Sequence, residues 1–426
     1  MWPWVWWRSS AVIARRSREG DVTPGLIEPP RLRSADSREL RDVRGLNPSS
    51  SAGWFLAMTE SPSTLHRAAA RNVVTKYLRV RRGENAIVES WDHTMPLASA
   101  MVDEIRRVDG EVLLVRNDED SWWRTIDRKQ SKLLGRSSAP EWAALRAADV
   151  YVNLWGPGNT DRIERLPDKP GEEAFAWNWP WYAVARKAGL RGVRMTAGFV
   201  TEGRARQWRV DRTKWEKSVL RASLVDPAEI AKNGARIGKV LSRGKKVRIT
   251  HTNGTDIEVG LAGIAPRVLD GRAHPFRKGD SPSGMLQQAP AGTVDVALDS
   301  ERAEGRFRAN RRTNIWWQWH TGGSLKFVGG RLAAYDLDHG AKEFTRQYED
   351  GSSGRDRASV LKIGLNPAVH DVPNLETVEG GSVSLQIGGN RYLRGSNQSN
   401  FFSWFTLAGS EIAVDGVPIV RAGRIL

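Results

Sequence analysis

The stretch ADVYVNLWGPGNT, residues 148–160, decides the fold class of this chain. Val150 to Leu154 form a short apolar run of the kind that makes a buried strand, and the glycines that follow at 156 and 158 indicate a turn. A glycine turn at the carboxyl end of a strand is where open α/β sheets bind ligands. This turn has neither the GxGxxG spacing nor a Lys-Ser/Thr ending, so we interpret it as an ordinary turn.

Apolar runs and helical patterns alternate on both sides of this strand. We expect helices over 65–78, 96–108 and 141–148, strands over 86–88 and 112–115 with the second one buried, and two helices between 212 and 241. Such alternation is typical of βαβ units around a parallel sheet. We therefore predict an α/β N-terminal domain with a parallel sheet over residues 58–240.

The pattern changes near residue 240. Short strand-like runs separated by Gly, Asn, Asp and Pro occur at 246–250, 257–261, 294–298, 324–328, 331–334, 383–387 and 411–414. One helical pattern lies among them, at 341–348. We predict a β-rich α+β C-terminal domain over residues 241–426.

Residues 1–57 differ from the rest of the chain. The opening MWPWVWW places its aromatic residues ahead of the arginines, the reverse of a secretory signal. We expect Met58 to be the natural initiator, and 1–57 to be disordered or a gene-model extension. A targeting segment is the alternative.

Composition narrows the function classes. With no cysteine, the chain has no disulfide, thiolate metal site or cysteine nucleophile. The net charge of +16 makes nucleic-acid binding a function to consider. However, the basic residues are mostly interleaved with acidic ones, which favours a solvated surface or the attraction of an anionic ligand. No apolar run approaches the ~18 residues of a membrane span. We expect a cytoplasmic protein without a membrane or nucleic-acid partner.

A series of short motifs in the second half carries a family resemblance. They are THTNGTDI (250–257), APAGTVDVA (289–297), VGGRL (328–332), IGLNP (363–367), GGSVSLQIG (380–388), NQSNFFSW (397–404) and VDGVPI (414–419). In order and spacing they resemble the C-terminal domain of the aminopeptidase T family of metallopeptidases, and the similarity spans about 58–426. The resemblance implies an aminopeptidase T-like fold, a homodimer, and a hydrolase that activates water with two divalent metals.

The same resemblance implies where the metal ligands would lie. The family's glutamates, histidines and aspartate would fall at positions that hold other residue types here: Thr293, Val360, Ser384, Phe402 and Trp404. None of these is a carboxylate or an imidazole. We therefore expect a degenerate metallopeptidase site in the C-terminal domain and no cofactor.

For each of the other candidate site residues, a structural role is the alternative to a functional one. Ser384 is a conceivable nucleophile, but no adjacent base is apparent. The resemblance places Tyr392 near a family active-site tyrosine, where it would bind a ligand or pack. His320 could be a general base in an aromatic pocket, although we favour a structural role.

Two clusters of neighbouring residues add alternatives. The run WNWPW at 177–181 alternates aromatics, as one face of a strand or a ligand-stacking wall would, and core packing is the default. An aromatic cleft in basic surroundings would suit a planar, anionic or amide-bearing small molecule. The acids of DLDH (336–339) could help to hold a metal, but we interpret them as caps of a helix N-terminus.

Three functions stay open at this point. We favour a metal-free relative of an aminopeptidase that binds or transforms a small amide-bearing or anionic molecule in the inherited cleft. The second is an active metal-dependent aminopeptidase or other hydrolase, holding Zn, Co or Mn through relocated ligands such as Asp295, His320 or Asp338. The third is a non-catalytic scaffold or regulatory partner. The residues alone do not decide whether the chain is an enzyme.

Overall fold

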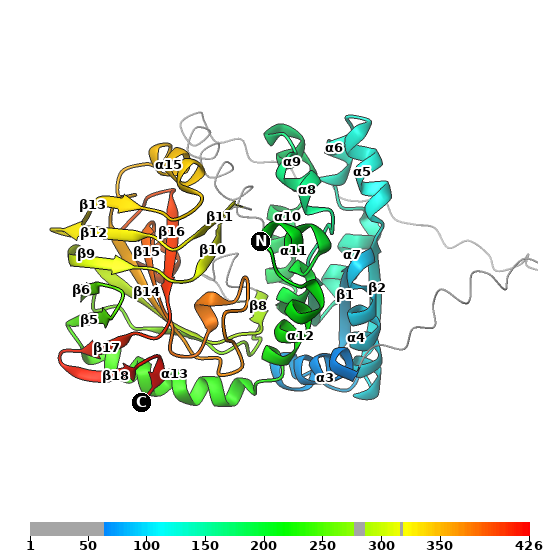
Figure 1. Cartoon of the computed structure of the whole chain (residues 1–426). Coiled ribbons are helices and arrows are strands. Elements are labelled where there is room, and N and C mark those ends of the chain that lie inside the picture. The colour runs from blue at the N-terminus through cyan, green and yellow to red at the C-terminus, as the bar shows by residue number, and fades with distance from the viewer. Residues whose placement is uncertain (1–63, 277–285, 316–317) are drawn as a thin grey trace, which may run out of the picture. The chain divides into compact units, whose positions relative to one another are not determined.

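The computed structural model describes residues 64–276, 286–315 and 318–426, and all of these belong to one compact unit. The predictions for residues 1–57 lie outside the described residues. Within the described ranges the chain has a parallel sheet and a β-rich antiparallel region (Figure 1). Both parts of the predicted fold class are therefore present.

Five strands form the parallel sheet. In spatial order they are β2 (Glu111–Asn117), β1 (Asn85–Trp91), β3 (Val150–Leu154), β4 (Arg191–Met195) and β8 (Leu286–Ala289). The predicted strand at 150–154 is β3, at the centre of the sheet. The last strand, β8, comes from beyond residue 240, the predicted boundary between domains, which itself stays a prediction.

Helices cover both faces of this sheet. One face packs Val88 and Val152 against α3 (Thr64–Asn72), the π-helical turn η2 (Val73–Leu78) and α4 (Met95–Arg107). The other face packs Ile87 and Tyr151 against α7 (Ala139–Ala147) and α10 (Asn178–Lys187). Successive residues of a strand point to opposite faces, so two neighbouring positions serve two different cores.

The remaining helices of this half are shorter or follow the sheet. They are α5 (Glu119–Asp127), α6 (Ser131–Leu134), α8 (Thr160–Glu164), α9 (Asp168–Ala174), α11 (Glu202–Trp208), α12 (Arg212–Ala222) and α13 (Pro227–Arg243). Asn159 of the glycine turn caps α8, because its side-chain oxygen accepts from the backbone N–H of Arg162. That contact agrees with the interpretation of an ordinary turn.

The second sheet is antiparallel. Its main path runs through β16 (Phe402–Leu407), β15 (Val383–Gly388), β14 (Ala358–Gly364), β9 (Thr293–Arg308), β6 (Thr255–Leu261), β5 (Lys246–His251), β17 (Glu411–Val414), β18 (Val417–Arg421) and β19 (Arg424–Ile425). Beside this path lie β7 (Arg267–Leu269), β12 (Ser324–Val328) and β13 (Arg331–Asp336), while β10 (Arg312–Ile315) and β11 (Gln318–Thr321) form a separate pair.

The long strand β9 connects two parts of this sheet. Its first residues pair with β14 and β7, and its later residues pair with β6 and β12. Figure 1 shows β9 with β14 and β15 beside it. Large apolar side chains such as Phe307, Phe327 and Phe405 fill the core of this half and are fully buried.

Two strand expectations need correction. The run at 112–115 is a strand, but it is not buried: Leu113 and Leu114 are 47% and 36% exposed, because β2 is the edge of the sheet. The WNWPW run is not a strand either. It begins helix α10, where Trp177 and Trp181 are four positions apart and therefore lie on the same side.

The helix predicted at 341–348 is α15 (Ala341–Glu349), but it begins differently from the expectation. Its N-cap is Gly340, and no side chain caps it. Asp336 belongs to β13 instead. Glycine allows the left-handed backbone conformation found at this position, so the turn into α15 does not depend on a capping acid.

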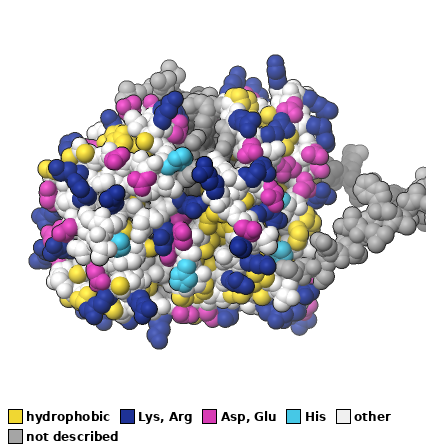
Figure 2. All heavy atoms as spheres, viewed as in Figure 1, with side chains coloured by type: hydrophobic (Ala, Val, Ile, Leu, Met, Phe, Trp, Pro, Cys, Tyr) yellow, Lys and Arg dark blue, Asp and Glu magenta, His cyan; other side chains and the backbone are white. Residues whose placement is uncertain are grey.

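Charged side chains of both signs are interspersed on the surface. On the face in Figure 2, Lys and Arg (dark blue) lie among Asp and Glu (magenta). One example is Arg248, which forms a two-bond pair with Asp256 across the β5–β6 hairpin. Among the described residues, no helix is long and apolar enough to cross a membrane.

Candidate functional site

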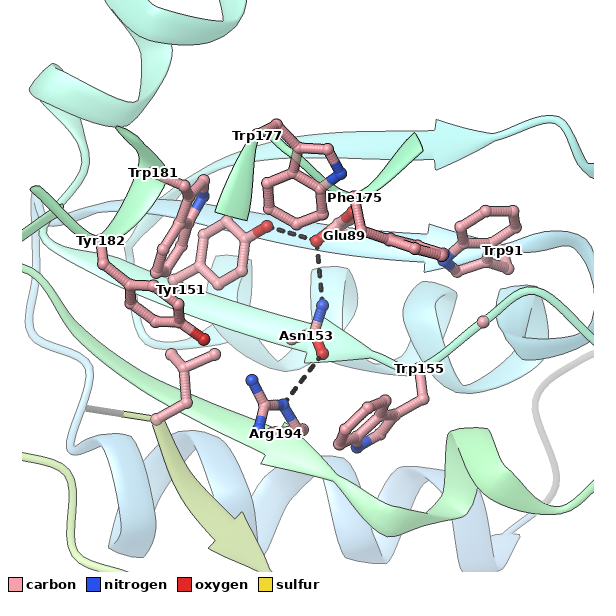
Figure 3. Close-up of a pocket in the computed structure, with 12 residues that line it drawn as sticks. Glu89, Trp91, Tyr151, Asn153, Trp155, Phe175, Trp177, Trp181, Tyr182 and Arg194 are labelled. Carbon is pink, nitrogen blue, oxygen red and sulfur yellow. Dashed lines mark hydrogen bonds between the residues drawn. The ribbon is translucent and has the colours of Figure 1, made fainter. Parts of the chain in front are cut away.

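The parallel sheet changes direction between β1 and β3. The chain proceeds from β1 to β2 on one side and then returns to place β3 and β4 on the other. In open α/β sheets, ligands bind outside the carboxyl ends of the strands at such a reversal. A cavity lies at this position, on the face of the sheet that α10 covers (Figure 3).

Aromatic side chains form most of the cavity wall. The lining consists of strand residues, the segment after β3, and the start of α10: Glu89, Trp91, Tyr151, Asn153, Trp155, Gly156, Phe175, Trp177, Trp181, Tyr182, Arg194 and Leu286. The cavity holds about 50 Å³. Since one water needs roughly 10–15 Å³ by this measure, the space suits a few waters or the head group of a ligand.

Three polar side chains form a row across the floor of this cavity. The parallel register pairs Glu89 on β1 with Asn153 on β3, and Asn153 with Arg194 on β4. Asn153 Nδ2 donates to Glu89 Oε2 at 2.9 Å, and Arg194 Nε donates to Asn153 Oδ1 at 3.4 Å. A neutral amide therefore separates a carboxylate from a guanidinium (Figure 3).

Glu89 is held by neutral donors. Besides Asn153, it accepts hydrogen bonds from Asn117 Nδ2 at 3.0 Å and from the Tyr151 hydroxyl. Burial and the nearby charge of Glu89 raise the pKa of Tyr151 well above its usual value, so Tyr151 remains a donor at neutral pH. No described cationic group forms an ion pair with Glu89.

Arg194 is a buried cation. Arg194 is 5% exposed, and its guanidinium lies over the Trp155 ring, 4.4 Å from the ring centroid. Burial raises the pKa of Tyr182, and the neighbouring Arg194 opposes that rise. Among the described residues, no carboxylate lies within ion-pair distance of Arg194. A buried charge normally has a partner of opposite sign, whereas the acceptors that the described residues offer Arg194 are neutral: the amide oxygen of Asn153 and the hydroxyl of Tyr182.

The sequence-predicted residues divide between this cavity and the other half of the chain. Trp177 and Trp181 line the cavity, as the ligand-wall alternative requires. Trp181 also belongs to a buried apolar cluster and Trp177 packs against it, as the default of core packing expects. Ser384, Tyr392 and His320 do not line it, and all three lie in the β-rich half.

Ser384 and Tyr392 lie close to one another. Ser384 on β15 is fully buried, and its hydroxyl hydrogen-bonds that of Thr406 at 2.8 Å. Tyr392 donates to Gln386 Oε1 at 3.2 Å. Lys362 is the cross-strand neighbour of Ser384, and its ammonium lies 5.2 Å from the centroid of the Tyr392 ring.

The five positions that the family resemblance singled out lie on four adjacent strands. Thr293 is on β9, Val360 on β14, Ser384 on β15, and Phe402 and Trp404 on β16. The registers of these strands place them on the same face of the sheet. The predicted convergence of these positions is thus compatible with the fold.

A buried ion pair occupies this same face. Lys362 Nζ lies 2.5 Å from Asp295 Oδ2, and Asp295 is 1% exposed. Burial alone would lower the pKa of Lys362, but the charge of Asp295 and the Tyr392 hydroxyl hold it above its usual range. The second carboxylate oxygen of Asp295 is buried and has no hydrogen-bond partner among the residues that the structure describes. Lys362 is therefore the ionic partner of Asp295 on this face.

His320 lies on the opposite face of this sheet. It is 6% exposed, and its ring centroid lies 4.8 Å from that of Phe405 and 6.0 Å from that of Phe344. Within the described part of the chain, neither ring nitrogen of His320 has a hydrogen-bond partner. Burial lowers the pKa of His320 to about 4, so the ring is neutral at pH 7. This apolar packing, away from Ser384, agrees better with a structural role than with a general base.

The pH dependence of stability should reveal His320. Because its pKa is lower in the folded chain than in the unfolded chain, the unfolded chain binds the extra proton, and stability falls as pH drops from about 6.5 toward 4. Between pH 7 and 4.5, the wild type is expected to lose roughly 2–3 kcal/mol more unfolding free energy than His320→Leu, measured by urea denaturation. Equal losses in the two proteins would contradict this assignment.

Glu376 is a second buried group whose charge is suppressed. It begins the short 3-10 helix η5 (Glu376–Val378) and is 4% exposed. Its Oε1 accepts from the backbone N–H of Asn374 at 3.0 Å. Burial outweighs this bond and raises the pKa of Glu376 to about 8. Within the described ranges, no group of three or more His, Asp or Glu side chains is placed so that it could hold a metal ion, and this includes the surroundings of Glu376.

Sequence reasoning missed the polar row of the cavity. A weak signal was available, because Glu89, Asn153 and Arg194 each follow a buried valine directly, near the carboxyl end of a strand. A polar residue at such a place in a buried strand needs a partner or a ligand. The strand order and register that unite the three residues are not visible in the sequence.

Comparison with known proteins supports the fold. No family model and no curated protein matches the sequence. The similar solved structures include AmpT from Thermus thermophilus, with TM-score 0.62 and 16% identity, covering 85% of this chain and 99% of that one. They also include 2,5-dihydroxypyridine dioxygenase from Pseudomonas putida, with TM-score 0.54 and 12% identity, covering 85% of this chain and 96% of that one. At these identities the likeness shows an aminopeptidase T-like fold alone.

Proposed function

We propose that this chain binds a small anionic or amide-bearing molecule in the aromatic cavity of its α/β half. The buried guanidinium of Arg194 is the observation that carries the proposal. It is stacked on Trp155, and no described carboxylate pairs with it. A ligand oxygen would supply the missing acceptor, and flat aromatic side chains would contact the rest of the molecule.

The proposal moves the binding site from where the sequence suggested it. The favoured interpretation placed the ligand in the inherited cleft, at the positions of Thr293, Ser384 and Trp404. That face now presents the Lys362–Asp295 pair and buried side chains. The cavity at the carboxyl ends of β1, β3 and β4 offers both space and a polar group in need of a partner.

We also propose that binding needs no divalent metal. The residues at the five resemblance positions do not fit a dinuclear centre, because Thr, Val, Ser, Phe and Trp provide no carboxylate or imidazole ligand. In addition, the ammonium of Lys362 points to the same face and would oppose a cation there. The support is the chemistry of the residues present.

Substitution of Arg194 tests the site. Protein treated with EDTA is titrated calorimetrically with benzoate and benzamide. Arg194→Met is expected to weaken whichever of the two binds by about 10- to 100-fold, the value of a hydrogen bond to a charged group. Arg204→Met is the matched control, because Arg204 is also buried and lies over an aromatic ring, that of Phe199, outside the cavity lining.

Three results would count against the proposal. If neither compound binds the wild type, or if Arg194→Met binds as tightly as the wild type, the cavity is not the proposed site. If binding appears only after Zn, Mn or Co is restored, the metal-free part is wrong.

A further inference from the structure

We propose that the ligand's head group is a neutral carboxamide on a planar aromatic body, with its oxygen toward Arg194 and its N–H toward Glu89. This inference rests on the proposed function and decides between its two ligand classes. It assigns a role to Glu89, which the anion-binding alternative leaves without one.

The Asn153 side chain already has the orientation that we propose for the amide of the ligand. Its amide nitrogen donates to Glu89 and its amide oxygen accepts from Arg194. The three residues occupy matching positions on neighbouring strands, which lie about 4.8 Å apart. Glu89 and Arg194 are therefore separated by the width of one amide. A second amide from a ligand can span the same two groups with the same orientation.

Both end groups retain hydrogen-bonding capacity. A carboxylate offers about four acceptor positions, and three donors from the chain reach Glu89. A guanidinium offers five N–H donors, and Arg194 gives one to Asn153 and one to the Tyr182 hydroxyl, which leaves donors for a ligand. A ligand that both donates and accepts would thus add to the existing contacts without displacing them.

Charge favours an amide over a carboxylate. Neither Glu89 nor Arg194 is in an ion pair with any charged residue that the structure describes, so the row presents one negative and one positive group. A carboxylate would suit Arg194, but its second oxygen would face Glu89 without a proton to share, and like charges repel. A neutral amide is a dipole that matches both ends of the row.

Size and wall chemistry favour an aromatic body. The cavity of about 50 Å³ accommodates a carboxamide but not a whole ring, since an aromatic ring needs roughly 150 Å³. Trp177 is only partly buried, unlike Trp181 and Phe175, so it lies toward the rim. A ring attached to the amide would contact these aromatic side chains and gain from edge or offset packing.

The test compares benzamide with benzoate, which have the same shape and differ in the N–H and the charge. Wild-type protein is expected to bind benzamide at least tenfold more tightly in calorimetric titrations. Glu89→Gln removes the charge with little change of shape, and it is expected to reduce this preference to less than threefold. Glu119→Gln is the matched control: Glu119 also accepts three hydrogen bonds, but it lies outside the cavity lining. It should keep the wild-type preference.

The outcomes separate this inference from the proposed function. Equal or tighter binding of benzoate by the wild type, with Arg194 still required, would overturn the carboxamide and leave the cavity as an anion site. A preference unchanged in Glu89→Gln would remove Glu89 from recognition. Failure of both compounds to bind the wild type would overturn both proposals. The wild-type comparison holds even if Glu89→Gln does not fold.

Discussion

Lys362→Met is expected to lower the free energy of unfolding by about 3–5 kcal/mol. Asp295 is 1% exposed, and the ammonium of Lys362 is its only ion-pair partner among the described residues. Without that partner, the carboxylate must remain charged in a buried place or take up a proton, and either costs stability. Urea denaturation at pH 7, followed by circular dichroism, measures the loss.

A double substitution distinguishes loss of the charge pair from loss of packing. Asp295→Asn combined with Lys362→Met removes both charges and is expected to recover most of the lost stability. Lys326→Met is the matched control, since Lys326 is an exposed lysine on strand β12, and it should change stability by less than about 0.5 kcal/mol. If Lys362→Met loses no more than this control, the pair does not stabilise the fold.

Glu376→Gln is expected to stabilise the protein at alkaline pH. The pKa of Glu376 is raised to about 8 in the folded chain, so the folded chain holds a proton that the unfolded chain releases above pH 4.5. Its contribution is therefore present below pH 4.5 and is lost as pH rises through 8. At pH 9 the variant should exceed the wild type by roughly 4 kcal/mol, with little difference at pH 4.5.

The pH dependence of that difference is the decisive quantity. Urea denaturation at pH 4.5, 6, 7.5 and 9 measures it. Glu349→Gln on α15 is the matched control at an exposed glutamate. A difference between Glu376→Gln and wild type that stays constant with pH would show that Glu376 titrates normally.

Much of the fold could be predicted because the strongest signals are local. The apolar run from Val150 to Leu154 became the central strand β3, and the helical periods at 65–78 and 96–108 became α3 with η2 and α4. In the second half, runs punctuated by Gly and Asn gave strands at the expected places. These patterns depend on neighbours within one element, which a sequence displays directly.

Features that depend on position within a sheet were harder to predict. The VLLV run at 112–115 has the composition of a buried strand, but it forms the sheet's edge, which no property of those four residues determines. The WNWPW run fits a strand by its alternation and a helix by the spacing of Trp177 and Trp181, and the helix formed. Local pattern could not decide between them.

The candidate site could be predicted only in part. The turn at 156–160 and the tryptophans at 177 and 181 were singled out, and Gly156 and both tryptophans line the cavity. Glu89, Asn153 and Arg194 are far apart in the sequence, and only the parallel register makes them neighbours. The choice of Ser384 and Tyr392 followed a family resemblance, and that of His320 followed its place in an aromatic-rich stretch. No contact in the structure assigns any of the three a role in binding.

The origin of β8 has a consequence for the order in which the chain is synthesised. By the time Arg194 leaves the ribosome, every polar residue of the cavity floor has been made, yet β4 still has an open edge. Leu286, which closes one wall, and the strand that pairs with β4 emerge only after β5, β6 and β7 of the other half. A nascent chain halted between the two halves would carry the recognition groups without the cavity. On the proposed function, ligand binding would therefore require the ribosome to have passed the codons of β8.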